Sequence, residues 1–107
     1  MHWIYLIIAS IFEIGWPFGF KMATHSIYKV YWLIFAVISM ALSGYFLYLA
    51  QQKIEISTAY IVWTGLGAAG TFLLGIIFFN ETYDILKLLS FLMILIGVVG
   101  IKFVSHQ

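Results

Sequence analysis

The chain has 107 residues, of which 64% are hydrophobic and 8% are charged, and its formal net charge is +1. Soluble domains carry roughly 25% charged residues, so this composition excludes an ordinary soluble protein and predicts an all-α membrane protein. The five lysines form no basic cluster, which argues against nucleic-acid binding, and the sequence contains no cysteine for a disulfide or a thiolate metal site.

Four stretches are long and apolar enough to cross a membrane as helices, because a crossing helix needs about 20 mostly apolar residues. In chain order they run from Trp3 to Met22, Val30 to Ala50, Ser57 to Phe79 and Ile85 to Phe103. The connections hold most of the remaining charge and are too short for separate domains. We therefore expect a single four-helix transmembrane domain over residues 1–107, embedded in the lipid bilayer, with consecutive helices antiparallel.

The first span contains Glu13, which is the one acidic residue inside any of the four spans. This residue lies about seven positions from either end of the span, or roughly 10 Å at 1.5 Å per residue, and its side chain is too short to reach water easily. An ionised carboxylate without a partner is costly at this depth. Glu13 is therefore expected to exchange a proton or to be paired with a cation. A glutamate that only assembles the helices is the alternative.

Helical spacing places three informative residues on the face of Glu13: Ser10 one turn before it, and Trp16 and Pro17 one turn after it. The Ser10 hydroxyl is a candidate for orienting the carboxylate. Trp16 can present its indole N–H to the carboxylate or its ring face to a bound cation, although an ordinary packing role is the alternative. Pro17 removes the backbone hydrogen bond that would reach the Glu13 carbonyl, and it permits a kink at this point.

The second and third spans supply a further set of polar and aromatic residues. Tyr60, Trp63 and Gly67 share one face of the third span, with Thr64 beside them, and this surface is suited to enclosing an organic cation. Gly67 could equally serve close helix packing. Ser43 is a hydroxyl in the middle of the second span, where a bond to its own helix is the alternative to a role in the site.

The distribution of lysines bears on the orientation of the chain in the membrane. Lys21, Lys29 and Lys87 lie on one side, against Lys53, Lys102 and the terminal amine on the other. Because the positive charges on the two sides are nearly equal, the positive-inside rule favours neither orientation. We therefore expect the chain to insert in both directions, and two opposite copies to pair as an antiparallel dimer. A single orientation decided by one lysine contact or by the local lipid is the alternative.

Two arguments favour a dimer over a single copy. Four helices are few for a pathway that must admit a solute and exclude ions, whereas two copies supply eight helices and two Glu13 carboxylates. The fourth span offers a contact surface, because Ser90 and Gly97 lie seven residues apart on one face and would let two helices approach closely. Glycine is also common in membrane helices without any such role.

Several segments carry a family likeness in their order and spacing: IFEIGW around Glu13, AYIVWTGLGAAG in the third span, IIFFNE at its end and LIGVVGIK in the fourth. Together they resemble the small multidrug resistance family along nearly the whole chain. The resemblance implies a multi-pass transporter of the bacterial inner membrane, assembled as an antiparallel dimer. It also implies exchange of a cation for protons at a shared pair of glutamates, and Glu13 matches the glutamate of the family.

A tryptophan three residues after that glutamate, here Trp16, resembles the guanidinium-exporter subtype, whereas the multidrug subtype typically has glycine there. The resemblance implies that Ser43, Tyr60 and Trp63 line the pocket, that Trp16 and Ser43 position the carboxylates, and that Tyr60 links the site to a gate. Pro17 and a first loop without glycine, ATHSIYKVY, depart from the subtype pattern. These departures leave open a bulkier cation or pairing with a sister chain.

The prediction from sequence is a proton-coupled antiporter that exports small organic cations, with guanidinium favoured, by alternating access around two Glu13 carboxylates. The partners expected are an organic cation, protons and a second copy of the chain. Alternatives are export of quaternary ammonium, other hydrophobic or polyamine cations, a place in a heterodimeric exporter, and a membrane protein that transports nothing. An enzyme is not expected, since no nucleophile and base are arranged around the carboxylate, and neither a cofactor nor a metal is predicted.

Overall fold

The structure is a computed structural model that describes residues 2–104, so residue 1 and residues 105–107 of the predicted domain lie outside the described residues. Within it the chain forms four helices: α1 (His2–His25), α2 (Lys29–Gln51), α3 (Ile56–Phe79) and α4 (Ile85–Val104). All four are long and apolar enough to cross a membrane. The four predicted spans are confirmed, with each helix extending at most three residues beyond the predicted bounds.

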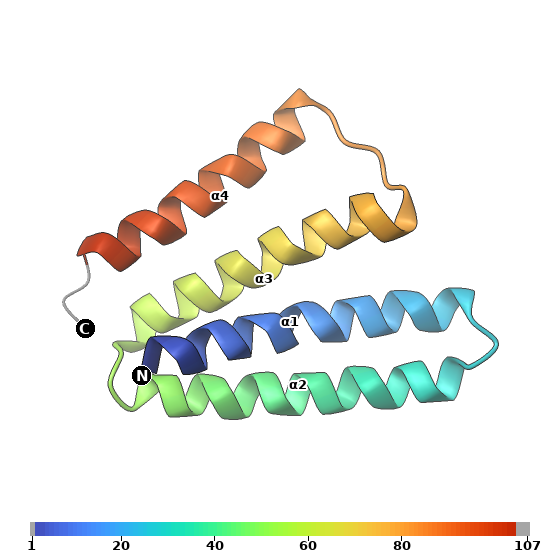
Figure 1. The fold of residues 1–107 in the computed structure, drawn as a ribbon, viewed down its shortest axis with the longest axis horizontal. Coiled ribbons are helices and arrows are strands. Elements are labelled where there is room, and N and C mark those ends of the chain that lie inside the picture. Colours follow the sequence, from blue (N-terminus) through green and yellow to red (C-terminus); the bar gives the residue numbers. More distant parts are fainter. Residues whose placement is uncertain (1, 105–107) are drawn as a thin grey trace.

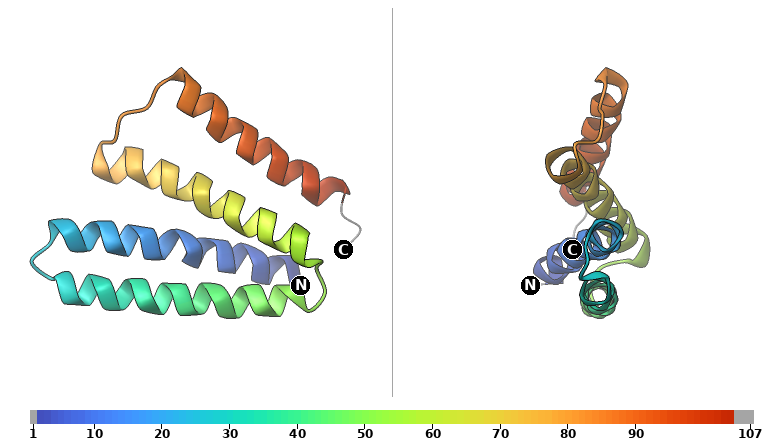
Figure 2. Two further views of the ribbon diagram at one scale, coloured as in Figure 1. Left: turned by 180° about the vertical axis from the view of Figure 1, so that it is seen from behind. Right: turned by 90° about the vertical axis from the view of Figure 1, so that its right-hand side faces the viewer.

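The helices lie side by side in an open layer rather than in a closed bundle. Helix α1 lies between α2 and α3, and α4 lies on the outer side of α3 (Figure 1). Viewed along the helices, the four are arranged nearly in a row (Figure 2), and the molecule extends over 47 × 34 × 16 Å. Because the layer is about one helix thick at most points, most helices expose apolar side chains on both faces.

The hydrophobic core lies at one end of the layer, near the start of α1. Its buried members come from all four helices and from the connection between α2 and α3: Leu6, Ala50, Ile54, Ala59, Val62 and Val98. At the same end the Lys102 ammonium lies 4.7 Å from the centre of the Trp3 ring, a cation–π contact between α4 and α1. Toward the connection between α3 and α4 the two helices diverge (Figure 1). Helices α3 and α4 are thus fastened together at one end and splayed at the other, whereas α1 still contacts α2 and α3 at the far end through Phe18.

Small residues allow the helices to approach closely where they do pack. A Cβ atom built on Gly19 of α1 would lie 2.9 Å from the Phe35 ring and 3.1 Å from both the Ala36 side chain and the Trp32 carbonyl oxygen of α2. On the other side of α1, a Cβ on Gly70 of α3 would collide with the Ile14 side chain. Close approach through glycine is the usual means of packing membrane helices, whose surroundings are as apolar as their side chains.

The connection between α3 and α4 is held by its backbone. Asn80 ends α3 in the left-handed conformation (φ 51°, ψ 35°), which asparagine adopts more readily than most residues. The N–H of Glu81 then donates to the Gly75 carbonyl at 3.1 Å, closing the helix end. Three residues later Asp84 Oδ1 accepts a hydrogen bond from the Lys87 N–H at 2.9 Å, so Asp84 caps the start of α4.

Helix α4 is the least covered of the four. Among its described residues only Val98 is buried, and a Cβ built on Gly97 or Gly100 would meet nothing within 4 Å in the described part of the chain. The Ser90 hydroxyl donates to the Leu86 carbonyl of its own helix at 2.9 Å. The predicted contact surface of Ser90 and Gly97 is therefore open to solvent or lipid in one copy of the chain, and pairing through it stays a prediction.

The packing at Gly19 gives a stability prediction. Gly19→Ala places a methyl group against the α2 backbone at a buried position, so the two helices must separate slightly, and we expect a loss of about 1–3 kcal/mol in the free energy of unfolding. The matched control is Gly44→Ala on α2, where a Cβ meets nothing within 4 Å in residues 2–104. Unfolding in detergent followed by circular dichroism measures both. Equal stability of the two variants would contradict the close α1–α2 contact.

Candidate functional site

The Glu13 carboxylate is held from within its own helix. The Trp16 indole Nε1–H donates a hydrogen bond of 2.7 Å to Glu13 Oε1, which is the contact expected for residues three positions apart on a helix. A hydrogen bond to an ionised acceptor is stronger than a neutral one, and it directs one carboxylate oxygen. Both side chains are half-buried, and within residues 2–104 the Trp16 indole is the one hydrogen-bond donor to the Glu13 carboxylate.

Across the helix interface, Glu13 lies against the backbone of α3 at Gly67. A Cβ atom built on Gly67 would be 2.6 Å from the Glu13 Cγ, so any side chain at this position would displace the glutamate. Gly67 is itself buried. The absence of a side chain at Gly67 thus leaves the space that the Glu13 side chain occupies, and a supporting role of Gly67 in the site stays a prediction.

Beside the carboxylate is an open hollow of about 390 Å³ between α1 and α3. Its lining consists of Glu13 with small, hydroxyl-bearing or ring residues: Pro17, Thr64, Gly67, Ala68 and Thr71. The Thr71 hydroxyl donates to the Gly67 carbonyl at 2.7 Å, and the Thr64 hydroxyl donates to the Tyr60 carbonyl at 2.7 Å. Glu13 is therefore the one charged residue among those that line this hollow, and both threonine hydroxyls already donate to backbone carbonyls.

Pro17 affects both the hydrogen bonding within α1 and the lining of the Glu13 hollow. It lies inside α1, which continues to His25, and as a proline it supplies no N–H to the Glu13 carbonyl one turn earlier. Its ring lines the hollow directly beside the carboxylate. Pro17 thus removes a backbone donor at the same turn of helix that carries the acid.

A second polar cluster joins α1, α2 and α3 one helical turn away. The Ser43 hydroxyl of α2 donates to the Ala9 carbonyl of α1 at 2.8 Å, and its oxygen accepts the Trp63 indole N–H of α3 at 2.8 Å. Ser43 is buried, and it bonds across helices rather than within its own helix. Ala9 precedes Glu13 by four residues, so this cluster adjoins the carboxylate site along α1.

Two other predicted residues are placed differently from the cluster. The Tyr60 side chain is 55% exposed, and its ring centre lies 5.6 Å from that of Trp63, so it flanks the cluster from outside. Ser10 is buried, but its hydroxyl donates to the Leu6 carbonyl of its own helix at 2.8 Å. The structure therefore does not bring the Ser10 hydroxyl to Glu13, because the helix backbone offers it a nearer acceptor.

Two residues near the site were not singled out from sequence. Thr71 lines the Glu13 hollow, and its position four residues after Gly67 was the available signal. Glu81 lies in the connection after α3, and its carboxylate folds back toward Gly75, which only the geometry of the turn reveals. Among residues 2–104 no group of three His, Cys, Asp or Glu side chains is arranged to hold a metal ion.

Comparison with known proteins identifies the family. The family model described as Small Multidrug Resistance protein matches residues 1–104. The chain belongs to the small multidrug resistance family. With its four apolar spanning helices, it is a multi-pass transport protein of the bacterial inner membrane.

Relatives within the small multidrug resistance family match over nearly their full length. The guanidinium exporter of Proteus vulgaris is 40% identical over 105 residues, covering 98% of this chain and 100% of the relative. The guanidinium exporter of Escherichia coli (strain K12) is 35% identical over 106 residues, covering 99% and 100%. A protein of Bacillus licheniformis named probable guanidinium efflux system subunit GdnC is 39% identical over 107 residues, covering 100% and 94%. The resemblance seen in the sequence is confirmed.

The Ser43 cluster gives a second prediction. Ser43→Ala leaves the Trp63 indole N–H and the Ala9 carbonyl without their shared partner, and we expect a loss of about 1–3 kcal/mol in stability. The matched control is Ser90→Ala, whose hydroxyl bonds within an exposed turn of α4, with an expected change within about 0.5 kcal/mol. Denaturant unfolding in detergent, read by tryptophan fluorescence, compares them. If Ser43→Ala is as stable as Ser90→Ala, the hydrogen bonds of Ser43 between helices do not stabilise the fold.

Proposed function

We propose that this chain is a proton-coupled exporter of small organic cations, with guanidinium as the favoured substrate. The observation that carries the proposal is the Glu13 carboxylate, oriented by the Trp16 indole and facing an open hollow between α1 and α3. The names of the relatives, guanidinium exporters over nearly the full length of the chain, support the same substrate. In this role the protein moves a solute and changes no chemical bond in it, so it is not an enzyme.

The chemistry of guanidinium suits this site. Its planar N–H groups donate in parallel to carboxylate oxygens, a geometry that gives short, strong hydrogen bonds. Its flat faces are weakly hydrated and stack on aromatic rings. Glu13 offers the acceptor, and the Trp16 indole contacts it directly. The Trp63 and Tyr60 rings, which lie together on α3, are the further aromatic surfaces proposed for the cation.

The proposed working unit is an antiparallel dimer. An open layer about 16 Å thick cannot surround a solute by itself, whereas a second copy facing it would close the hollow and bring a second Glu13 opposite the first. The near-balance of lysines on the two sides permits opposite insertion. The open face of α4 around Gly97 and Gly100 is the proposed contact. A sister chain could take the place of the second copy, as the word subunit in the name of the Bacillus relative suggests for that protein.

The proposed cycle follows from competition for the two carboxylates. On the loading side the cation binds, and protons leave the Glu13 pair because the carboxylates hold either ligand. The two subunits then exchange conformations, so that access changes to the other side. There, protons bind the carboxylates and release the cation. Each turnover returns the site to its protonated form, and a proton gradient drives export.

The first functional prediction concerns the carboxylate. Glu13→Gln keeps the size and the Trp16 hydrogen-bond acceptor but removes the charge, so guanidinium uptake by proteoliposomes under an imposed proton gradient should fall to the level of protein-free vesicles. The control is Glu55→Gln, which removes the same charge from the connection before α3 and should retain uptake. Uptake by a folded Glu13→Gln protein at the wild-type rate would refute the proposed function.

The identity of the substrate is tested in the same vesicles. Guanidinium and a tetraalkylammonium ion are offered to the wild-type protein in parallel, because the quaternary ion carries the same charge but has no N–H donors. Saturable transport of guanidinium alone supports the proposed substrate. Transport of the quaternary ion alone would instead assign the chain to export of hydrophobic cations by the same carboxylates.

A further inference from the structure

A second carboxylate lies outside the Glu13 hollow and has no part in the cycle above. Glu81 lines a smaller hollow of about 200 Å³ between α1 and the end of α3, together with Lys21, Thr71 and Pro17. Pro17 and Thr71 also line the Glu13 hollow, so the two hollows adjoin along these two residues. A cation in the Glu81 hollow would thus be next to the Glu13 site.

The position of Glu81 is fixed by the chain around it. The left-handed turn at Asn80 and the hydrogen bond from the Glu81 N–H to the Gly75 carbonyl hold the backbone. The carboxylate lies over Gly75, where a built Cβ would collide with Glu81 Oε1. Gly75 is buried and belongs to the same hollow. The absence of a side chain at Gly75 therefore makes room for the carboxylate to face α1.

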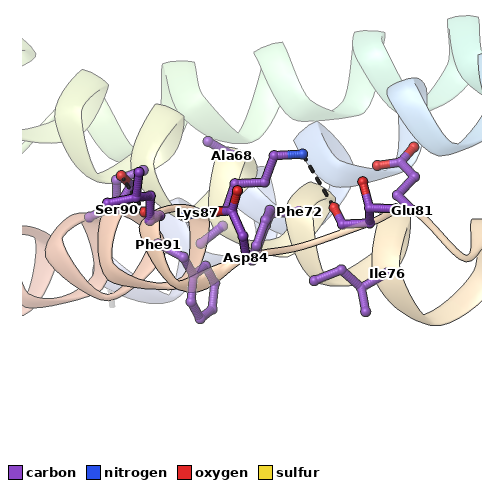
Figure 3. Close-up of a pocket in the computed structure, with 12 residues that line it drawn as sticks. Ala68, Phe72, Ile76, Glu81, Asp84, Lys87, Ser90 and Phe91 are labelled. Atoms are coloured by element: carbon purple, nitrogen blue, oxygen red, sulfur yellow. Dashed lines mark hydrogen bonds between the residues drawn. The ribbon is translucent and has the colours of Figure 1, made fainter.

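Two ammonium groups, those of Lys21 and Lys87, line hollows that Glu81 also lines, but neither forms an ion pair with it in residues 2–104. Within residues 2–104 its carboxylate accepts no hydrogen bond and forms no ion pair. The Lys87 ammonium donates to the Thr82 carbonyl at 3.2 Å, the bond drawn as a dashed line from Lys87 in Figure 3. Asp84 is engaged as the cap of α4. Lys21 lines the hollow, and in the described chain its ammonium is not paired with Glu81.

We propose that Glu81 is a second cation-binding site, a recruiting carboxylate in the hollow that adjoins the Glu13 hollow at Pro17 and Thr71. The inference rests on the proposed function, since the ligand is the same class of small organic cation with N–H donors. A carboxylate with free oxygens at an aqueous entrance raises the local concentration of cations and the rate of their capture. In an antiparallel dimer the two copies place one Glu81 at each face of the membrane, so that both entrances carry one.

The test compares guanidinium uptake by proteoliposomes of four proteins over a range of concentrations: wild type, Glu81→Gln, Gly75→Ala and Glu55→Gln. Glu81→Gln should raise KM about threefold or more with a maximal rate close to that of wild type, and high ionic strength should reduce the difference. Gly75→Ala keeps the charge but occupies the place of Oε1, so it should raise KM in the same direction. Glu55→Gln, which also removes one acid per subunit but lines neither hollow, should match wild type.

The outcomes separate recruitment from a structural role and from the proposed function. An unchanged KM in Glu81→Gln, an equal rise in Glu55→Gln, or a lower maximal rate at unchanged KM overturns the proposal and leaves Glu81 as part of the end of α3. If Glu81→Gln loses its helical content by circular dichroism, Gly75→Ala decides alone through its KM. Glu13→Gln is measured in parallel: wild-type uptake by that variant refutes the proposed function, whereas the KM of the Glu81 variant refutes only this inference.

Discussion

The cost of a carboxylate inside an apolar helix is the constraint on which the rest of this structure depends. Glu13 is stabilised by the Trp16 indole from its own helix, and it has room because α3 presents the bare backbone of Gly67. The contact with Gly67 requires α1 and α3 to pack closely, which in turn requires Gly70 opposite Ile14. The placement of glycines is thus a consequence of where the charge lies as well as of helix packing.

The helical core of the fold and the contact within one helix could be predicted from the sequence. The four spans follow from length and apolar composition, and the Glu13–Trp16 hydrogen bond follows from a spacing of three residues. The bond from Ser43 to Ala9 could not be predicted, because it depends on which helices are lateral neighbours. Ser10 shared the face of Glu13 but turned to its own backbone, an acceptor that every serine in a helix has available.

The side-chain direction of Glu81 could not be predicted from helical periodicity either. The residue follows the last turn of α3, and helical spacing no longer predicts the direction of its side chain. Asn80 signals a left-handed turn in the sequence, but which residue the turn brings over Gly75 is a matter of three-dimensional geometry. The sequence places both acids in the connection between two spans, which does not distinguish the cap position of Asp84 from the surroundings of Glu81.

Helices α3 and α4 are fastened together around Val98 at one end and splayed at the other, where a hollow of about 410 Å³ lies between them. A chain built in this way has a polarity along the membrane normal. Two identical copies inserted in opposite directions would present one fastened and one splayed end at each face. The two faces would therefore be equivalent, so access from one side alone requires the two copies to hold different conformations, and an exchange of those conformations reverses the access without any difference in sequence.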